Sequence, residues 1–164
     1  EAAIEEYRGG CACGAARYVV RGEPIFVNNC YCTLCQRQTG STSVVNGFIE
    51  GDAVRLETGA LSRHVLKSGS GGDHVIHRCA ACGTALWSNL ARLGELMLGV
   101  RAGTLDDPTR WRPDAAIFIT SAPPWVTLPE GIPHFETMYV PKEFLSPERY
   151  ARLRALASSI SWRW

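Results

Sequence analysis

The seven cysteines of this sequence fall in three tight groups whose spacing is typical of metal ligands. The groups are Cys11-Ala-Cys13, Cys30-Tyr-Cys32-Thr-Leu-Cys35 and Cys79-Ala-Ala-Cys82. A C-x-x-C turn brings two sulfurs to about 3.5–4 Å, which is the edge of a sulfur tetrahedron around Zn²⁺. Gly14 and Gly83 each follow a group and suit knuckle-like turns that need unusual backbone angles. We therefore expect these cysteines to bind zinc.

Seven thiols divide into four and three, which predicts two zinc ions per chain in sites of different kinds. The two outer groups would enclose one structural ion completely, with ligands Cys11, Cys13, Cys79 and Cys82. The middle group, Cys30, Cys32 and Cys35, spans six residues and can cover only one face of a second ion. Zinc sites with three protein ligands and an open position are the catalytic kind. We therefore predict that these three cysteines hold a catalytic zinc.

Zinc with three thiolates carries a net charge of −1, so the open position should favour another sulfur. A thiol bound there loses its proton yet stays nucleophilic, which points to thiol chemistry. Two alternatives remain open at this point. The middle group could be a redox dithiol, although no βαβ pattern surrounds it. A histidine could also close the second site, with His77 the first choice and His134 the second.

The elements that must position these cysteines are predicted to be mostly short strands. Nine segments of alternating or β-branched apolar residues, bounded by Gly, Asn, Asp or Pro, read as strands: 16–21, 24–28, 43–49, 53–57, 63–68, 74–78, 84–88, 95–101 and 116–120. A turn of helix is expected at 33–39, a glycine-rich loop at 68–73 with His64 and His74 exposed beside it, and a proline-rich surface loop at 121–135.

A C-terminal helix is predicted over about 146–161. Ser146 is a good N-cap and Pro147 suits the first helical position. The apolar residues of this segment fall on one face: Tyr150, Leu153, Leu156, Ala157 and Ile160. Residues 1–164 together read as a single, mainly-β domain with this helix at its end.

The formal net charge of the 164 residues is +1, so no basic field exists to attract nucleic acid. No apolar run approaches the roughly 18–20 residues of a membrane span. The N-terminal residues lack the pattern of a secretory signal, and an odd number of cysteines at such close spacing does not fit a secreted disulfide framework. We expect a protein of the reducing cytoplasm that binds neither nucleic acid nor membrane.

Three motifs carry a family resemblance: GGCACGAARY at 9–18, NCYCTLCQRQTG at 29–40 and RCAACGTAL at 78–86. APPWV at 122–126 and PHF at 133–135 add a weaker match. The chain resembles the glutathione-dependent formaldehyde-activating enzyme family, which includes centromere protein V, over about residues 8–135. The resemblance implies a zinc-binding β-tent fold similar to that of the exchange factor Mss4. It also implies the same division into structural and catalytic zinc, and a carbon–sulfur lyase that joins formaldehyde to glutathione as S-hydroxymethylglutathione.

The resulting hypothesis is that a small thiol, such as glutathione, binds at the open position and attacks an aldehyde carbon. Gln36 and Arg37 follow the last ligand and could contact a glutathione carboxylate, or could simply face solvent. Trp125 could form a wall of the pocket or anchor the core. No carboxylate–histidine pair stands out as acid–base machinery. The alternative function is a non-catalytic, zinc-stabilised interaction module.

Overall fold

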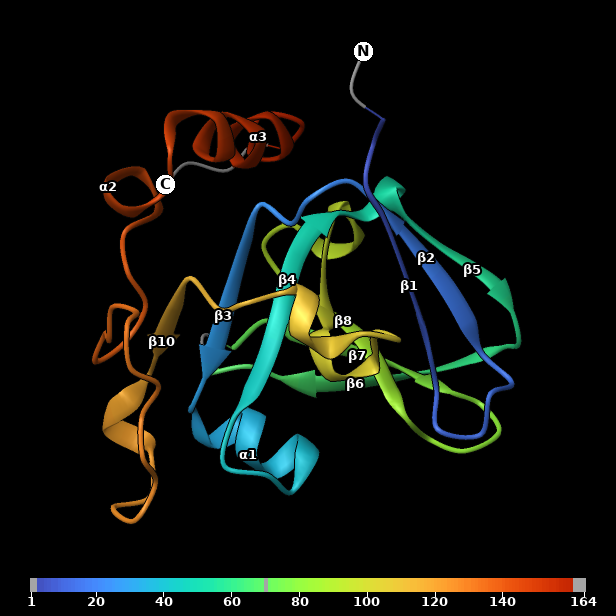
Figure 1. The fold of residues 1–164 in the computed structure, drawn as a ribbon, viewed down its shortest axis with the longest axis horizontal. Coiled ribbons are helices and arrows are strands. Elements are labelled where there is room, and N and C mark those ends of the chain that lie inside the picture. The colour runs from blue at the N-terminus through green and yellow to red at the C-terminus, as the bar shows by residue number, and fades with distance from the viewer. Residues whose placement is uncertain (1–2, 70, 161–164) are drawn as a thin grey trace.

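The computed structural model describes residues 3–69 and 71–160, and within them the chain is mainly β (Figure 1). The strands are β1 Glu6–Gly10, β2 Arg17–Arg21, β3 Phe26–Cys30, β4 Val44–Glu50, β5 Val54–Thr58, β6 Leu61–Lys67, β7 Asp73–Cys79, β8 Ala85–Asn89, β9 Met97–Arg101 and β10 Ala115–Ile117. The helices are α1 Thr33–Thr39, α2 Pro141–Phe144 and α3 Pro147–Ala157. Short 3₁₀ turns are η1 Gly51–Ala53, η2 Gly94–Leu96, η3 Ala102–Thr104, η4 Pro108–Arg110 and η5 Ile119–Ser121.

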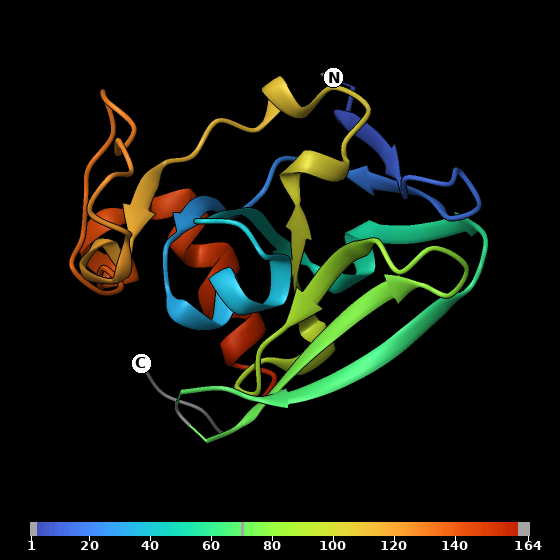
Figure 2. The same cartoon turned by 90° about the horizontal axis from the view of Figure 1, so that it is seen from below.

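The strands form two sheets. The smaller has the order β1-β2-β5, and the larger has the order β10-β3-β4-β9-β8-β7-β6. β10 pairs with β3 in parallel, whereas the other ladders are antiparallel. Figures 1 and 2 show the smaller sheet standing to one side of the larger, with α1 and the C-terminal helices at other faces. The two faces of the larger sheet are therefore covered by different elements, and two separate hydrophobic cores result.

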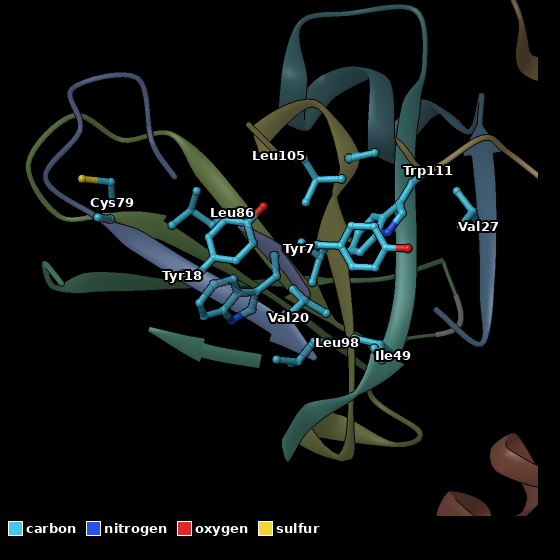
Figure 3. Close-up of a cluster of buried hydrophobic side chains, with 14 residues drawn as sticks. Tyr7, Tyr18, Val20, Val27, Ile49, Cys79, Leu86, Leu98, Leu105 and Trp111 are labelled. Atoms are coloured by element: carbon cyan, nitrogen blue, oxygen red, sulfur yellow. The ribbon is translucent and has the colours of Figure 1, made fainter. Parts of the chain in front are cut away.

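The first core fills the space between the two sheets (Figure 3). Tyr18 on the smaller sheet meets Trp87 on the larger one edge to face, with ring centroids 5.6 Å apart. Trp111 packs across Gly47 of β4, where an added Cβ would lie 2.5 Å from the indole ring. A glycine is therefore required at this point of the strand, because the indole occupies the space of a side chain.

The second core lies on the opposite side of β3 and β4, where α3 packs. Leu153 and Ala157 of α3 are buried there, while Tyr150 and Leu156 of the same helix and Ile160, which follows it, pack against this core. Arg152 adds a two-point ion pair with Glu50 at the end of β4, at 2.5 and 3.0 Å. The predicted C-terminal helix and its apolar face are thus confirmed, but α3 ends at Ala157, and residues 158–160 form a turn where the helix was expected to continue. Residue 161 lies outside the described residues.

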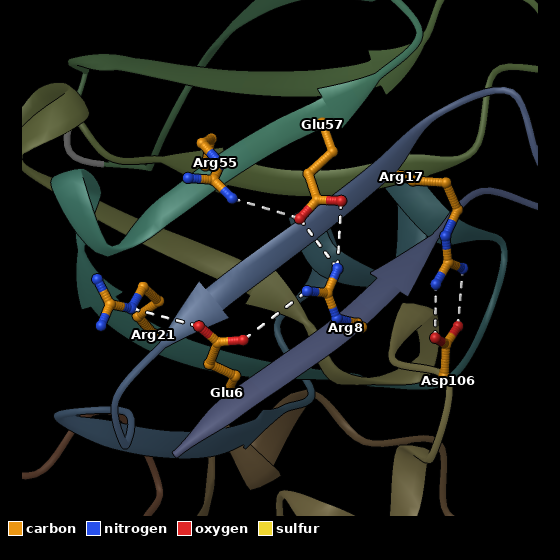
Figure 4. Close-up of polar contacts among 7 residues, drawn as sticks. All are labelled: Glu6, Arg8, Arg17, Arg21, Arg55, Glu57 and Asp106. Carbon is orange, nitrogen blue, oxygen red and sulfur yellow. Dashed lines mark hydrogen bonds and ion pairs between the residues drawn. The ribbon is translucent and has the colours of Figure 1, made fainter. Parts of the chain in front are cut away.

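The outer face of the smaller sheet is charged (Figure 4). Its ion pairs join Arg8 to Glu6 and Glu57, Arg21 to Glu6, Arg55 to Glu57, and Arg17 to Asp106. These side chains are largely solvent-exposed, so each pair contributes little to stability. The sequence pattern did not predict β1. Its residues give a weak strand signal, because Glu6 and Arg8 alternate with Tyr7 and two glycines end the strand.

The predicted architecture is otherwise confirmed: mainly β, with a C-terminal helix. Each of the nine expected segments overlaps a strand, with ends shifted by up to three residues, and the expected helical turn is α1. The overlap is smallest at 116–120, because β10 ends at Ile117 and a 3₁₀ turn follows. The stretch at 121–135 lies outside any strand, as its prolines predict. Within the described residues, no helix has the length and apolar character needed to cross a bilayer.

Candidate metal centre

Four cysteines meet where the β1–β2 turn approaches the β7–β8 turn. The sulfurs of Cys11 and Cys13 are 3.5 Å apart, and that of Cys13 is 3.9 Å from Cys79. All four sulfurs, including that of Cys82, lie within 4.8 Å of one another. Zn–S bonds of about 2.3 Å require sulfurs about 3.8 Å apart. The donor set therefore fits a tetrahedral zinc ion with every position filled by protein.

The two turns of this four-cysteine cluster have the same local construction. Gly14 has φ 81° and its N–H donates to the carbonyl of Cys11 at 3.1 Å. Gly83 has φ 82° and its N–H donates to the carbonyl of Cys79 at 2.8 Å. Glycine is favoured at both positions because the left-handed region strains other residues. The expected knuckle turns are thus present.

Thr84 ties the two turns together. Its hydroxyl oxygen accepts a hydrogen bond from the Ala12 N–H, at 3.2 Å, and lies 3.1 Å from the sulfur of Cys82. Hydrogen bonds from Thr84 lower the pKa of the Cys82 thiol to about 5. This sulfur is therefore ready to act as a thiolate ligand.

The other three cysteines meet where β3 leads into α1. Cys30 is the last residue of β3, Cys32 is the N-cap of α1, and Cys35 lies within the helix. The N–H of Cys35 donates to the sulfur of Cys32 at 3.3 Å. The three sulfurs lie within 4.8 Å of one another, and no other Cys, His, Asp or Glu of the described chain belongs to the group. This three-cysteine cluster could hold a metal ion with a position left over.

The three thiols cannot all ionise easily without a cation. Hydrogen bonds from Cys30 and Cys35 lower the pKa of Cys32 to about 2, so this thiol is ionised first. Hydrogen bonds with Cys32 and Cys35, together with burial, raise the pKa of Cys30. Like charges crowded in a buried place oppose one another, and a divalent cation removes that conflict.

Neither histidine considered as a fourth ligand belongs to this cluster. His77 is buried, and its Nε2 lies 2.9 Å from Oδ1 of Asn89. His134 places its Nε2 2.6 Å from the carbonyl oxygen of Pro129. Because both oxygens only accept hydrogen bonds, each histidine carries its proton on Nε2 and has no lone pair there for a metal.

Arg101 is a residue of this site that sequence reasoning missed. It ends β9 and is 6% exposed. Its Nη1 donates to Oδ1 of Asn46 at 2.5 Å, and its Nη2 donates to Oε1 of Gln38 at 2.9 Å. Its Nε has no hydrogen-bond partner. Burial lowers the pKa of the Arg101 guanidinium, whereas Cys35, Cys30 and Cys32 raise it.

Gln38 extends this polar contact to His74. This histidine is buried, whereas the sequence predicted that it would be exposed. Because Oε1 of Gln38 accepts from Arg101, its Nε2 must be the donor toward Nε2 of His74, 3.3 Å away. His74 therefore acts there as a neutral acceptor. Burial and the nearby Arg101 charge both lower the pKa of His74, in agreement with that state.

The three residues predicted to contact substrate lie in different surroundings. Nε2 of Gln36 donates to the carbonyl oxygens of Tyr31 and Ser121, at 2.8 and 2.9 Å, so this amide holds backbone. Arg37 is exposed on α1. Trp125 is 76% exposed on the proline-rich loop, so it does not anchor the core. Gln36 nevertheless ties the beginning of that loop to α1.

Fold and clusters together define a mainly-β protein with two separate cysteine groups that could each hold a metal ion. The sequence profile of the family described as glutathione-dependent formaldehyde-activating enzyme matches residues 6–121. The chain belongs to this family.

A Halomonas elongata protein provisionally named glutathione-dependent formaldehyde-activating enzyme is 28% identical over 133 residues, covering 73% of this chain and 79% of that protein. Among solved structures, a Rhodobacter sphaeroides protein described as a structural genomics target is 17% identical. Its TM-score is 0.46, and the match covers 77% of this chain and 98% of that one.

Proposed function

We propose that this protein is a zinc-dependent enzyme of the carbon–sulfur lyase type that condenses formaldehyde with a thiol such as glutathione. The product would be the S-hydroxymethyl adduct. The observation that carries the proposal is the contrast between a complete four-cysteine cluster and a three-cysteine cluster without a fourth protein ligand among the described residues. Family membership and the name of the Halomonas relative support the choice of substrates.

The donor set fits the proposed metal. Three thiolates suit Zn²⁺ among the common metals, and their mutual repulsion calls for a divalent cation. A zinc ion held by Cys30, Cys32 and Cys35 would supply an open position at which a substrate thiol is kept as thiolate. We assign the four-cysteine cluster to a second, structural zinc, because its four sulfurs leave no place for substrate.

The reaction balances without any oxidant or reductant. The thiol sulfur forms a bond to the aldehyde carbon, the C=O double bond becomes a single bond, and the oxygen receives the proton that the thiol gave up. His74 is unsuited to donate that proton through Nε2, because this atom faces the amide hydrogen of Gln38. The contribution of this chain is thus mainly to bind and orient the sulfur nucleophile.

Arg37 and Trp125 are the exposed side chains that we propose as contacts for the rest of a glutathione molecule. Arg37 would offer a guanidinium to a carboxylate, and Trp125 would offer an aromatic face. Gln36 would act indirectly, because its amide hydrogens already hold two carbonyl oxygens. We place this chemistry in the reducing cytoplasm, in keeping with seven free thiols.

Metal content and activity of paired variants test the proposal. We expect two zinc ions per wild-type chain and formaldehyde-dependent loss of free glutathione above the uncatalysed rate. Cys35→Ser should stay folded, bind one zinc fewer and lose the activity. Cys11→Ser should lose the fold itself, because zinc binding at such a site contributes directly to folding. A wild-type protein with two zinc ions and no rate enhancement would instead indicate an interaction module.

A further inference from the structure

Arg101 is a buried charge without the counterion that buried arginines ordinarily have. Its two hydrogen-bond partners, Asn46 and Gln38, are neutral amides. Among the residues that the structure describes, no carboxylate forms an ion pair with it. Burying an unpaired charge is costly, so a nearby anion would stabilise Arg101.

The register of the strands places Arg101 on the face of the sheet that carries Cys30. Arg101 lies opposite Asn46 in the β4–β9 ladder, and Asn46 lies opposite Asn28 in the β3–β4 ladder. Cys30 is two residues beyond Asn28 on the same strand. Residues directly opposite and residues two apart share a face of a sheet.

The helix leads to the same place. Gln38 is three residues beyond Cys35 in α1, and positions at this spacing are neighbours on one side of a helix. Gln38 therefore holds the guanidinium of Arg101 from the side that bears Cys35. Burial and the neighbouring Arg78 lower the pKa of Arg101, whereas charge on the sulfurs of Cys35, Cys30 and Cys32 raises it, so ionised sulfurs of the cluster would stabilise the guanidinium.

We propose that Arg101 is a specificity-determining residue whose fixed positive charge makes the open position of the three-cysteine cluster select a ligand that binds as an anion. Three thiolates and Zn²⁺ carry a charge of −1, and a fourth thiolate makes it −2. Arg101 offsets part of that excess in a place where water does so poorly. A neutral ligand adds no charge, so it gains nothing from Arg101.

The proposal rests on the proposed function only in placing a metal at the three-cysteine cluster. It is tested with the full chain loaded with Co²⁺, whose spectrum reports the ligands of each site. At one fixed pH, 2-mercaptoethanol and imidazole are titrated separately, as an anionic and a neutral ligand. The complete four-cysteine cluster serves as the internal reference, because its band should respond to neither.

Two substitutions remove the field of Arg101 in different ways. Arg101→Met deletes the charge, and Asn46→Asp keeps Arg101 but sets a carboxylate against it. Each should weaken binding of 2-mercaptoethanol about tenfold or more and leave imidazole binding within about twofold. Arg101→Lys should keep most of the thiol affinity, and Arg55→Met on the smaller sheet should change neither. If Arg101→Met fails to fold, Asn46→Asp still decides, because its side chain is nearly isosteric and gains an ion pair.

Equal weakening of both ligands, or an unchanged thiol affinity in Asn46→Asp, would overturn the proposal, because a purely structural role predicts one of these results. The outcome is separate from that of the proposed function. A selective loss of thiol binding in a protein without turnover supports the role of Arg101 and rejects the enzyme. Turnover in wild type together with unchanged ligand selectivity in the variants supports the enzyme and rejects the role of Arg101. A three-cysteine cluster that binds no cobalt rejects both proposals.

Discussion

Gln36 and Ser121 are joined by a hydrogen bond in which the side-chain Nε2 of Gln36 donates to the carbonyl oxygen of Ser121 at 2.9 Å. The same nitrogen donates to the carbonyl of Tyr31 at 2.8 Å, between two of the cysteines. One side chain therefore links the three-cysteine cluster to the start of the loop at 121–135. Loop position and cluster geometry should respond together when this link is broken.

Gln36→Leu should lower the free energy of unfolding by about 1–3 kcal/mol, because two carbonyl oxygens lose their partner. Faster proteolysis within 121–135 should accompany it. Urea denaturation and timed digestion measure the two effects. Gln36→Glu should be at least as damaging, since it sets a carboxylate against those oxygens. Arg37→Gln, one residue further along the exposed side, should leave both measurements unchanged.

The pairing of Glu50 with Arg152 should make the attachment of α3 sensitive to acid. Burial alone would raise the pKa of Glu50, but the hydrogen bonds from Arg152, the hydrogen bond from the backbone N–H of Glu50 and the charge of Arg152 together outweigh it and hold the pKa below its ordinary value of 4.5. The stabilisation is therefore complete above pH 4.5 and is lost as the pH falls through the lowered pKa. Its size is about 1 kcal/mol, because both side chains are partly solvated.

Unfolding free energies of wild type and Glu50→Gln between pH 3 and 7 measure this contribution. The variant should be less stable at neutral pH and should converge with wild type in acid. A constant difference over the whole range would show that the carboxylate charge has no part in holding α3.

Gly47→Ala should destabilise the protein by about 1–3 kcal/mol, because the new methyl group has no room beside Trp111. The added Cβ would lie 2.5 Å from Cε3 of the indole. Gly103→Ala is a matched control, since an added Cβ there meets nothing within 4 Å and its φ is not positive. Urea unfolding should separate the two variants clearly. Equal stabilities would mean that β4 can move away from Trp111 at little cost.

Trp125→Phe should leave the melting temperature nearly unchanged, because the side chain is 76% exposed. If Trp125 contacts glutathione as proposed, the variant should raise KM for the thiol and leave kcat largely intact. The wild-type indole should also change its fluorescence when glutathione binds. An unchanged KM would remove Trp125 from the binding site.

The cysteine clusters could be predicted from the sequence because their cysteines occur in closely spaced groups, such as Cys30, Cys32 and Cys35. Arg101 could not be found in this way. Its partners, Gln38 and Asn46, are 63 and 55 residues away, and only the pairing of β4 with β9 brings them together. Its position at the end of an apolar strand, two residues before a glycine, gave no sign of burial.

His74 illustrates the opposite error. A histidine beside a glycine-rich loop is expected to be exposed, yet β7 is an inner strand between β6 and β8, and the His74 side chain is buried in contact with Gln38 of α1. β1 was missed because its charges face solvent on a sheet of only three strands. Local pattern thus predicted the cysteine clusters and most strands, whereas burial depended on how the strands and helices packed together.

The four-cysteine cluster joins two turns that are far apart in the sequence. Cys13 and Cys79, whose sulfurs lie side by side in it, are separated by 66 positions along the chain. During synthesis on the ribosome, Cys11 and Cys13 emerge first and remain free thiols until β7 and β8 have been synthesised. During that interval they are open to oxidation or to capture of a stray metal ion. If this cluster holds the structural zinc that we propose, newly made chains in oxidatively stressed or zinc-starved cells should misfold first at this junction, whereas chains that have already folded around zinc should survive.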